Sequence, residues 1–305
     1  MVPPTVRRVF ARLRRLELHG SQYCFDEIIR DRDRIIVAKN LDDVKDLTPK
    51  VAEGLRGFSD FVKGVPIIVS REEGGERLED NIIYTRYRLP VVTPQTLEKI
   101  LNGSEEPLIY VSKGGVYVKL RGEELRRARE EKGMSRGELA RALGVTRRTI
   151  LYYEKGLSDA SIQVAAKMEE YVGSRVFARL SLEEVETLIE ETGRRRSGTR
   201  LSVRDEAIGK VLSILSRMGF REYLFSRSPF DAGAKKESVE EPRLLIGKEK
   251  VAEEPVEEIL DVTESRAILL SEGSGVKEGG RVLILPKEKV EEIKRHVGFL
   301  VGEEN

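Results

Sequence analysis

The sequence predicts a multidomain α+β protein in which a central all-α module is flanked by two α/β domains. With 305 residues, the chain is long enough for two or three domains of ordinary size. Signals that start and stop helices crowd its middle, whereas short runs rich in Val, Ile and Leu, typical of strands, lie on both sides. The expected divisions are an N-terminal α/β domain at 1–105, a β connector at 106–120, the helical module at 121–173, a helical and basic linker at 174–204 and a C-terminal α/β domain at 205–305.

The N-terminal domain shows strand and helix patterns in alternation. Two short apolar runs in "FDEIIRDRDRIIVAKN", joined by a charged turn, predict a hairpin. Apolar residues at helical spacing predict a helix around 47–63, "VPIIVS" predicts a buried strand, and "RLPVVTPQTLEKIL" predicts a strand that enters a helix at Thr93 and Pro94. The expected order is helix, hairpin, helix, strand, strand, helix. A further strand pair, with Gly114 and Gly115 in its turn, leads into the helical module.

The segment "GMSRGELARALGVTRRTILYYEKG" predicts two short helices joined by a tight turn. Ser135 and Glu138 have the spacing of a capping box, in which each residue satisfies the other's backbone amide, so a helix should begin there. Gly144 is suited to the positive φ at which that helix ends. Thr146 can cap a second helix, expected over about 146–155. Because the turn has only three residues, the two helices must cross steeply, as in a helix-turn-helix.

Arg147, Arg148 and Tyr152 remain on the free face of the second helix once its inward residues are assigned by periodicity. Arginine can bond guanine O6 and N7 in the major groove, and backbone amides at helix starts can bind phosphates. The alternative is a solvated surface helix held by salt bridges. The capping box, Gly144 and the short turn together favour DNA binding.

Over about residues 120–173, "LRRAREEKGMSRGELARALGVTRRTILYYEKG" resembles the Cro and C1 repressor type of helix-turn-helix, the XRE family. The resemblance implies an ion pair between Arg129 and Glu154, and a further helix over 160–172 completes the small core. The family often has glutamines where this chain has Arg147 and Arg148, so the resemblance does not imply the operator sequence. The expected DNA-binding residues are Ser135, Arg136, Thr146, Arg147, Arg148, Thr149, Tyr152 and Lys155.

The element order of the N-terminal flank recurs after residue 205, so the two flanks could be duplicates. "RAILLSEG" corresponds to "VPIIVSRE", and "RVLILPKEKVEEIK" to "LPVVTPQTLEKIL". In this correspondence Phe25 and Asp26 match Phe230 and Asp231, and Lys39 matches Lys248. Short strand and helix patterns can also agree by chance, and that alternative stays open.

An aspartate on one strand and a lysine at the end of the next resemble the restriction-endonuclease-like fold, in which a D...(D/E)xK arrangement holds magnesium. This chain has Val37 at the second acidic position, and Ile246 in the other flank. Metal-assisted cleavage needs at least two carboxylates around the ion, so the departure counts against activity. One alternative makes Asp26 a strand-edge turn residue and Lys39 a solvated cation. Another is a relic fold reused for dimerisation or sensing.

Composition limits the classes of function. Basic and acidic residues number 54 and 53, so DNA affinity must come from local patches rather than from overall charge. The 35% of charged residues, the few aromatic residues and the absence of Trp are typical of a heat-adapted protein. A single Cys24 excludes an internal disulfide, and only two His are present, so we expect no metal site and no cofactor. No run has transmembrane length or the features of a secretory signal, which indicates a cytoplasmic location.

Taken whole, the order of domains and phrases such as "GFREYLFSRSPFDAGAK" resemble the archaeal family of putative HTH-type transcriptional regulatory proteins. We therefore expect a non-enzymatic, sequence-specific regulator that binds double-stranded DNA as a homodimer, because one recognition helix reads too few base pairs. The flanking domains could supply the dimer contact. The alternatives are a structure-directed nuclease and an adaptor that binds another transcription protein. The sequence indicates neither the operator nor an effector.

Overall fold

The computed structural model describes residues 13–18, 22–32, 34–104, 106–112, 114–181, 184, 205–236, 243–250 and 255–301. The chain forms two compact units. Unit 1 contains Met1–Leu41, Lys45–Ile68 and Arg195–Asn305, and unit 2 contains Asp42–Val44 and Val69–Arg194. Strands from both ends of the chain therefore meet in unit 1, and the predicted N-terminal domain is shared between the two units.

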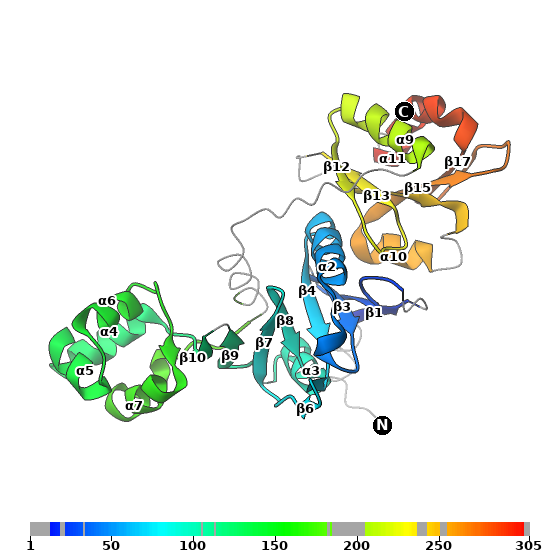
Figure 1. The fold of residues 1–305 in the computed structure, drawn as a ribbon. Helices are drawn as coiled ribbons and strands as arrows, with labels where there is room; N and C mark the ends of the chain where they lie inside the picture. The colour runs from blue at the N-terminus through cyan, green and yellow to red at the C-terminus, as the bar shows by residue number, and fades with distance from the viewer. Residues whose placement is uncertain are drawn as a thin grey trace, which may run out of the picture. The chain divides into compact units, whose positions relative to one another are not determined.

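The N-terminal part of unit 1 is built on an antiparallel run of strands followed by a helix and a buried strand (Figure 1). The predicted hairpin is present, with Glu27 opposite Ala38. The helix starts because Thr48 accepts a hydrogen bond from the Val51 amide at 3.3 Å and proline occupies the first turn. In order, the elements are β1 (Leu13–Glu17), β2 (Glu27–Asp31), β3 (Arg34–Asn40), α2 (Pro49–Val62) and β4 (Gly64–Val69), with strand order β1-β2-β3-β4.

The C-terminal part of unit 1 is a six-stranded mixed sheet of order β12-β13-β14-β15-β17-β16. Its central pairs, β14 with β15 and β15 with β17, are parallel, and the outer pairs are antiparallel. Helices α9 and α11 pack together, and α10 packs against β15 (Figure 1). The elements are α9 (Glu206–Arg217), β12 (Arg221–Leu224), β13 (Ala232–Lys235), β14 (Arg243–Lys248), α10 (Val256–Thr263), β15 (Ser265–Ser271), β16 (Lys277–Gly279), β17 (Val282–Pro286), the 3₁₀ helix η4 (Lys287–Glu292) and α11 (Ile293–Val301).

Unit 2 combines a strand-rich region with the helical module. Its strand order is β8-β7-β9-β10-β11, and the connector hairpin β9–β10 leads directly into the helices (Figure 1). The elements are β5 (Glu72–Glu73), β6 (Glu76–Arg77), β7 (Ile82–Arg86), β8 (Leu89–Val92), α3 (Pro94–Asn102), β9 (Ile109–Ser112), β10 (Gly115–Val118), α4 (Gly122–Glu131), α5 (Arg136–Leu143), α6 (Arg147–Glu154), β11 (Ala160–Ser161), α7 (Ile162–Val172) and the 3₁₀ helix η2 (Ser174–Val176). A further 3₁₀ turn, η1, spans Val44–Asp46.

The structure departs from the sequence prediction at several points, among them the strands β5, β6 and β7, which were not predicted. Leu13–Glu17 form strand β1, where the predicted order begins with a helix, because these residues pair with β2. The segment of helix α10 was not assigned to a helix, since no capping side chain marks its start as Ser135 and Thr146 mark those of α5 and α6. The module predicted as all-α contains β11, whose two residues pair with Tyr117 and Val118 of β10. Within the described part of the chain, no helix is long and apolar enough to cross a membrane.

Candidate nucleic-acid interface

Helix α5 begins and ends at the residues that the sequence indicates. The Ser135 hydroxyl accepts a hydrogen bond from the Glu138 amide at 3.2 Å, and the Glu138 carboxylate accepts one from the Ser135 amide at 2.7 Å. The Ser135 amide, followed by its hydroxyl, lowers the pKa of Glu138 below its ordinary value. At the other end Gly144 has φ 72°, a left-handed conformation that glycine adopts at little cost. These ends fix the turn into α6.

Helix α6 follows after that turn and presents its apolar face to the module. Thr146 is its N-cap and accepts a hydrogen bond from the Thr149 amide at 3.1 Å. The two threonine hydroxyls also lie 2.8 Å apart, so both are engaged at the helix start. Ile150 and Tyr153 are buried, and burial raises the pKa of Tyr153. The helix direction is therefore set by side chains opposite the candidate DNA-facing residues.

A buried carboxylate joins α4, α5 and α6. Glu154 at the end of α6 is 2% exposed and accepts hydrogen bonds from Arg129 Nε and Arg136 Nε, each at 2.6 Å. Arg129 also donates to the Met134 carbonyl at 2.7 Å, just before α5. Arg136, expected to contact DNA, is therefore already bound to Glu154, with 34% of its side chain exposed. The cluster of Arg129, Arg136 and Glu154 therefore holds α6 against α4 and α5.

The free face of α6 carries cations. Arg147, Arg148 and Lys155 are exposed, and Tyr152 is half-buried. Arg148 Nε donates to the Tyr152 hydroxyl at 2.8 Å, and its guanidinium lies 5.2 Å from the centre of the ring. Because Tyr152 is one helical turn further along, this contact restrains the direction of Arg148.

The charges at the start of α6 are unusual for an isolated helix. The N-terminal end of a helix carries partial positive charge, which acidic side chains commonly offset. The first turn of α5 has Glu138, whereas the first turn of α6 has no acidic residue and contains Arg147 and Arg148. Backbone dipole and side-chain charge therefore add at this end of α6, which makes it attractive to an anion such as a DNA phosphate.

Two residues that fix the module escaped the sequence analysis. Asp159 accepts hydrogen bonds from the Tyr110 hydroxyl at 2.9 Å and the Leu120 amide at 3.1 Å, and so joins the helices to the connector. Gly122 lets α4 approach the end of α6, because a Cβ there would lie 2.5 Å from the Glu154 carbonyl oxygen. Neither residue belongs to a local motif, and their partners are distant in sequence.

A second candidate site lies in unit 1, around the aspartate and lysine that suggest a nuclease. Lys39 Nζ lies 2.7 Å from Asp26 Oδ1 and donates to the Tyr23 carbonyl at 2.9 Å. The other carboxylate oxygen accepts a hydrogen bond from the Asn40 amide at 2.7 Å. Lys39 is 6% exposed, so the interpretation of this lysine as a solvated cation is wrong.

The residues around Asp26 do not fit a catalytic metal. The second acidic position of the motif is occupied by Val37, which is fully buried. Each oxygen of the Asp26 carboxylate already accepts a hydrogen bond, one from Lys39 and the other from the Asn40 amide. Among the residues that the structure describes, no group of three or more His, Cys, Asp or Glu is placed to hold a metal ion.

The corresponding region of the C-terminal flank differs. Asp231 donates its amide to the Ile246 carbonyl, as Asp26 does to that of Ala38. By this register Lys248 corresponds to Asn40, so the predicted match of Lys248 to Lys39 is wrong by one residue. Lys248 instead lies 3.2 Å from Asp205. Burial raises the pKa of Asp231, and the nearby charge of Lys248 offsets this only in part.

Comparison with known families finds a match for the helix-turn-helix module and another for the N-terminal, nuclease-like region. Residues 125–176 match the helix-turn-helix family model, and residues 8–107 match the PD-(D/E)XK superfamily domain. The chain is thus a mixed α/β protein with a PD-(D/E)XK-like domain and a helix-turn-helix domain. No solved structure gives a significant match.

Relatives over most of the chain share one description, "putative HTH-type transcriptional regulatory protein". One from Thermococcus kodakarensis is 30% identical over 93% of this chain and 87% of the relative. Others, from Methanocaldococcus jannaschii and Archaeoglobus fulgidus, are 30% and 33% identical over 89% and 75% of this chain, and over 81% and 71% of their own lengths. The chain belongs to this family. The predicted membership among the archaeal HTH-type transcriptional regulatory proteins is confirmed, together with the Cro/C1 type of helix-turn-helix.

Proposed function

We propose that this protein is a sequence-specific transcriptional regulator that reads double-stranded DNA by placing α6 in the major groove. The observation that carries the proposal is the exposure of Arg147 and Arg148 at the positive end of a helix whose opposite face is locked by the buried Glu154 cluster. Two guanidinium groups in that position destabilise the free helix, and a bound phosphate or guanine would relieve the repulsion.

The remaining residues have distinct roles in this proposal. Arg147 and Arg148 bond base edges, and Tyr152 orients Arg148 through their hydrogen bond. Ser135, Thr146 and Thr149 fix the starts of α5 and α6 through their capping hydrogen bonds, and the backbone amides left without a partner at those starts bond phosphates. Lys155 contacts a phosphate of the DNA backbone through the charge of its ammonium group. Arg136, bound to Glu154, contributes the outer part of its guanidinium.

Two chains bind one operator in this proposal. A single recognition helix covers only a few base pairs, and a genome contains many chance copies of so short a site. Two modules related by two-fold symmetry would double the readout, so the operator is expected to be a palindrome whose half-sites lie about one helical turn apart. No effector is assigned.

Selection of bound duplexes from a random pool, followed by sequencing, tests the proposal. A palindromic sequence should be enriched, with an affinity that falls steeply as salt rises. Arg147→Ala and Arg148→Ala should each weaken binding to the enriched site by roughly 10- to 100-fold and nonspecific binding by much less. Lys155→Ala should weaken both kinds of binding by a similar factor.

Arg217→Ala, which removes an exposed arginine from α9 in unit 1, is the matched control and should leave both affinities unchanged. A folded protein that enriches no sequence, or whose sequence preference survives Arg147→Ala/Arg148→Ala, would overturn the proposal.

A second candidate, a structure-directed nuclease, is favoured by the PD-(D/E)XK match at residues 8–107. The occupied Asp26 carboxylate and the buried Val37 argue against it. We expect no magnesium-dependent cleavage of duplex or branched DNA. Cleavage that Asp26→Ala abolishes, in protein purified side by side, would establish the nuclease instead.

A further inference from the structure

Two cations in unit 1 bind the ends of two helices. Lys235 of β13 donates to the carbonyls of Asp60 and Phe61 at 3.1 and 3.3 Å, in the last turn of α2. Arg30 of β2 donates to the Val262 carbonyl at 2.9 Å, in the last turn of α10. The C-terminal end of a helix carries partial negative charge, so each cation stabilises the helix that it caps. Each contact joins the N-terminal part of unit 1 to the C-terminal part.

The two cations occupy equivalent strand positions. The Leu18 amide donates to the Asp26 carbonyl and the Phe225 amide to the Asp231 carbonyl, so the two aspartates mark the same point in each sheet. Glu27 pairs with Ala38, and Ala232 pairs with Ile246, which gives β2 and β13 the same register from that point. Arg30 and Lys235 are each the fourth residue after their aspartate.

The carbonyls that they bind are equivalent too. Helix α2 ends in Lys63 at φ 57°, and α10 ends in Glu264 at φ 52°, both left-handed. Phe61 and Val262 each lie two residues before that cap. Arg30 of the N-terminal half therefore binds the Val262 carbonyl of the C-terminal half, and Lys235 of the C-terminal half binds the equivalent Phe61 carbonyl of the N-terminal half.

The packing around these contacts is reciprocal as well. In each half a helix connects the third and fourth strands: α2 lies between β3 and β4, and α10 between β14 and β15. Helix α2 packs against β12, and α10 packs against β1 and β2. Since β1 and β12 are the first strands of their sheets, each helix covers the corresponding strand of the other half.

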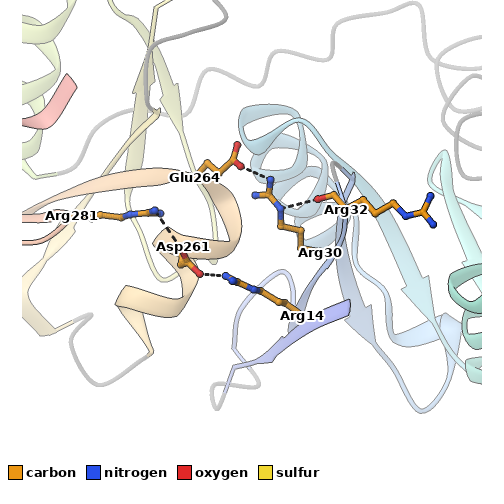
Figure 2. Close-up of a pocket in the computed structure, with 6 residues that line it drawn as sticks. All are labelled: Arg14, Arg30, Arg32, Asp261, Glu264 and Arg281. Atoms are coloured by element: carbon orange, nitrogen blue, oxygen red, sulfur yellow. Dashed lines mark hydrogen bonds and ion pairs between the residues drawn. The ribbon is translucent and has the colours of Figure 1, made fainter. Parts of the chain in front are cut away.

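The side chains at the two ends of this interface differ in character. At the α2 end, Phe58 and Phe61 pack edge-on against Phe225, with ring centres 5.4 and 5.3 Å apart. At the α10 end, Arg14 bonds Asp261 and Arg30 bonds Glu264, as Figure 2 shows. One end is thus held by aromatic packing and the other by ion pairs.

We infer that β1–β4 with α2 and β12–β15 with α10 are two copies of one PD-(D/E)XK-like fold, paired within the chain as an internal dimer. Contacts in which position i of one half meets position j of the other, and j meets i, are the signature of an isologous two-fold interface. The C-terminal flank, which lies outside the matched residues 8–107, is the second copy. The paired faces are occupied within one chain, so these faces do not join two chains of the regulator.

Isotope-coded cross-linking of the full chain tests the inference without DNA, so its outcome is independent of the proposed function. Arg14→Lys keeps a cation beside Asp261 and makes the pair reactive to a carbodiimide, which joins amines to carboxylates directly. Unlabelled and ¹⁵N-labelled protein are mixed before reaction. We expect a cross-link between positions 14 and 261 in which both peptides carry the same label.

Mixed-label cross-links would show that the faces pair between chains and would overturn the inference. So would the absence of the 14–261 cross-link from a sample in which Lys210 and Glu206, an exposed pair 2.8 Å apart on α9, do react. That pair is the internal positive control, because it needs only an intact α9.

A second measurement tests whether the two ends form one interface. Lys235→Gln removes the positive charge that caps α2, at the aromatic end, and should reduce the yield of the 14–261 cross-link at the other end, because both ends belong to one face. Lys236→Gln, at the next position, is the matched control and should leave the yield unchanged. An unchanged yield in folded Lys235→Gln protein would overturn the internal dimer.

Discussion

Arg129 of α4 and Glu154 of α6 form a buried ion pair, with Arg129 Nε 2.6 Å from Glu154 Oε1 and the two side chains 8% and 2% exposed. Arg136 of α5 binds the second oxygen of the same carboxylate. One acidic side chain therefore links all three helices and, together with their shared apolar core, sets the direction of Arg147 and Arg148.

Glu154→Gln should destabilise the protein by about 3 kcal/mol, because Arg129 would keep its buried charge without a carboxylate to offset it. Chemical denaturation measures the change in the free energy of unfolding. Glu170→Gln, at an exposed position of α7, is the control and should change it by less than about 0.5 kcal/mol. Equal stabilities for the two variants would contradict the role assigned to Glu154.

Two glycines of the module should respond to alanine for different reasons. Gly144→Ala places a Cβ at φ 72°, where the nearest atom is Lys167 Nζ at 3.8 Å, so the cost is backbone strain of about 1 kcal/mol. Gly122→Ala would place a Cβ 2.5 and 2.7 Å from two carbonyl oxygens of α6, which cannot retreat without moving the helix. We expect a larger loss there, about 2 to 3 kcal/mol.

Gly144→Asn distinguishes these causes. Asparagine tolerates the left-handed conformation better than alanine, so Gly144→Asn should be more stable than Gly144→Ala in the same denaturation series. A result in the reverse order would mean that space, rather than the φ angle, limits this position.

The capping box should give α5 a pH-dependent contribution to stability. Hydrogen bonds from Ser135 lower the folded-state pKa of Glu138, so the contribution is complete above the unfolded-state pKa and is lost as pH falls through the folded-state value. Glu138→Gln should lower the thermal midpoint at neutral pH. The difference from the parent protein should disappear in acid, below the folded-state pKa. A difference that stays constant across this range would contradict the assignment.

Asp26 and Lys39 should matter for stability rather than for catalysis. Asp26→Ala leaves the ammonium of Lys39, 6% exposed, without its carboxylate and should cost about 3 kcal/mol of unfolding free energy. Asp26→Ala/Lys39→Met removes both charges and should recover part of that loss. Denaturation of the three proteins measures both effects, and a silent Asp26→Ala would show that the pair has no structural role.

Local sequence signals predicted the helices of the helix-turn-helix module. The contacts that these signals did not predict involve residues that are distant in the sequence. The capping box of Ser135 and the positive φ of Gly144 involve neighbours within four residues, so the sequence alone reveals them. The position of Arg136 on Glu154 depends on how α5 meets the far end of α6. Likewise, the spacing that suggested Lys39 as a catalytic residue could not show that it is buried against Asp26 and the Tyr23 carbonyl.

The pairing of Phe58 and Phe61 with Phe225 also constrains how the protein is made. Synthesis proceeds from the N-terminus, so the ribosome releases the aromatic face of α2 long before it adds Phe225, the residue that covers this face. The entire helix-turn-helix is made in between. Contacts so remote along the polypeptide form slowly, and an apolar surface left uncovered in the meantime invites aggregation. The nascent chain should therefore need shielding by a chaperone until its last third emerges.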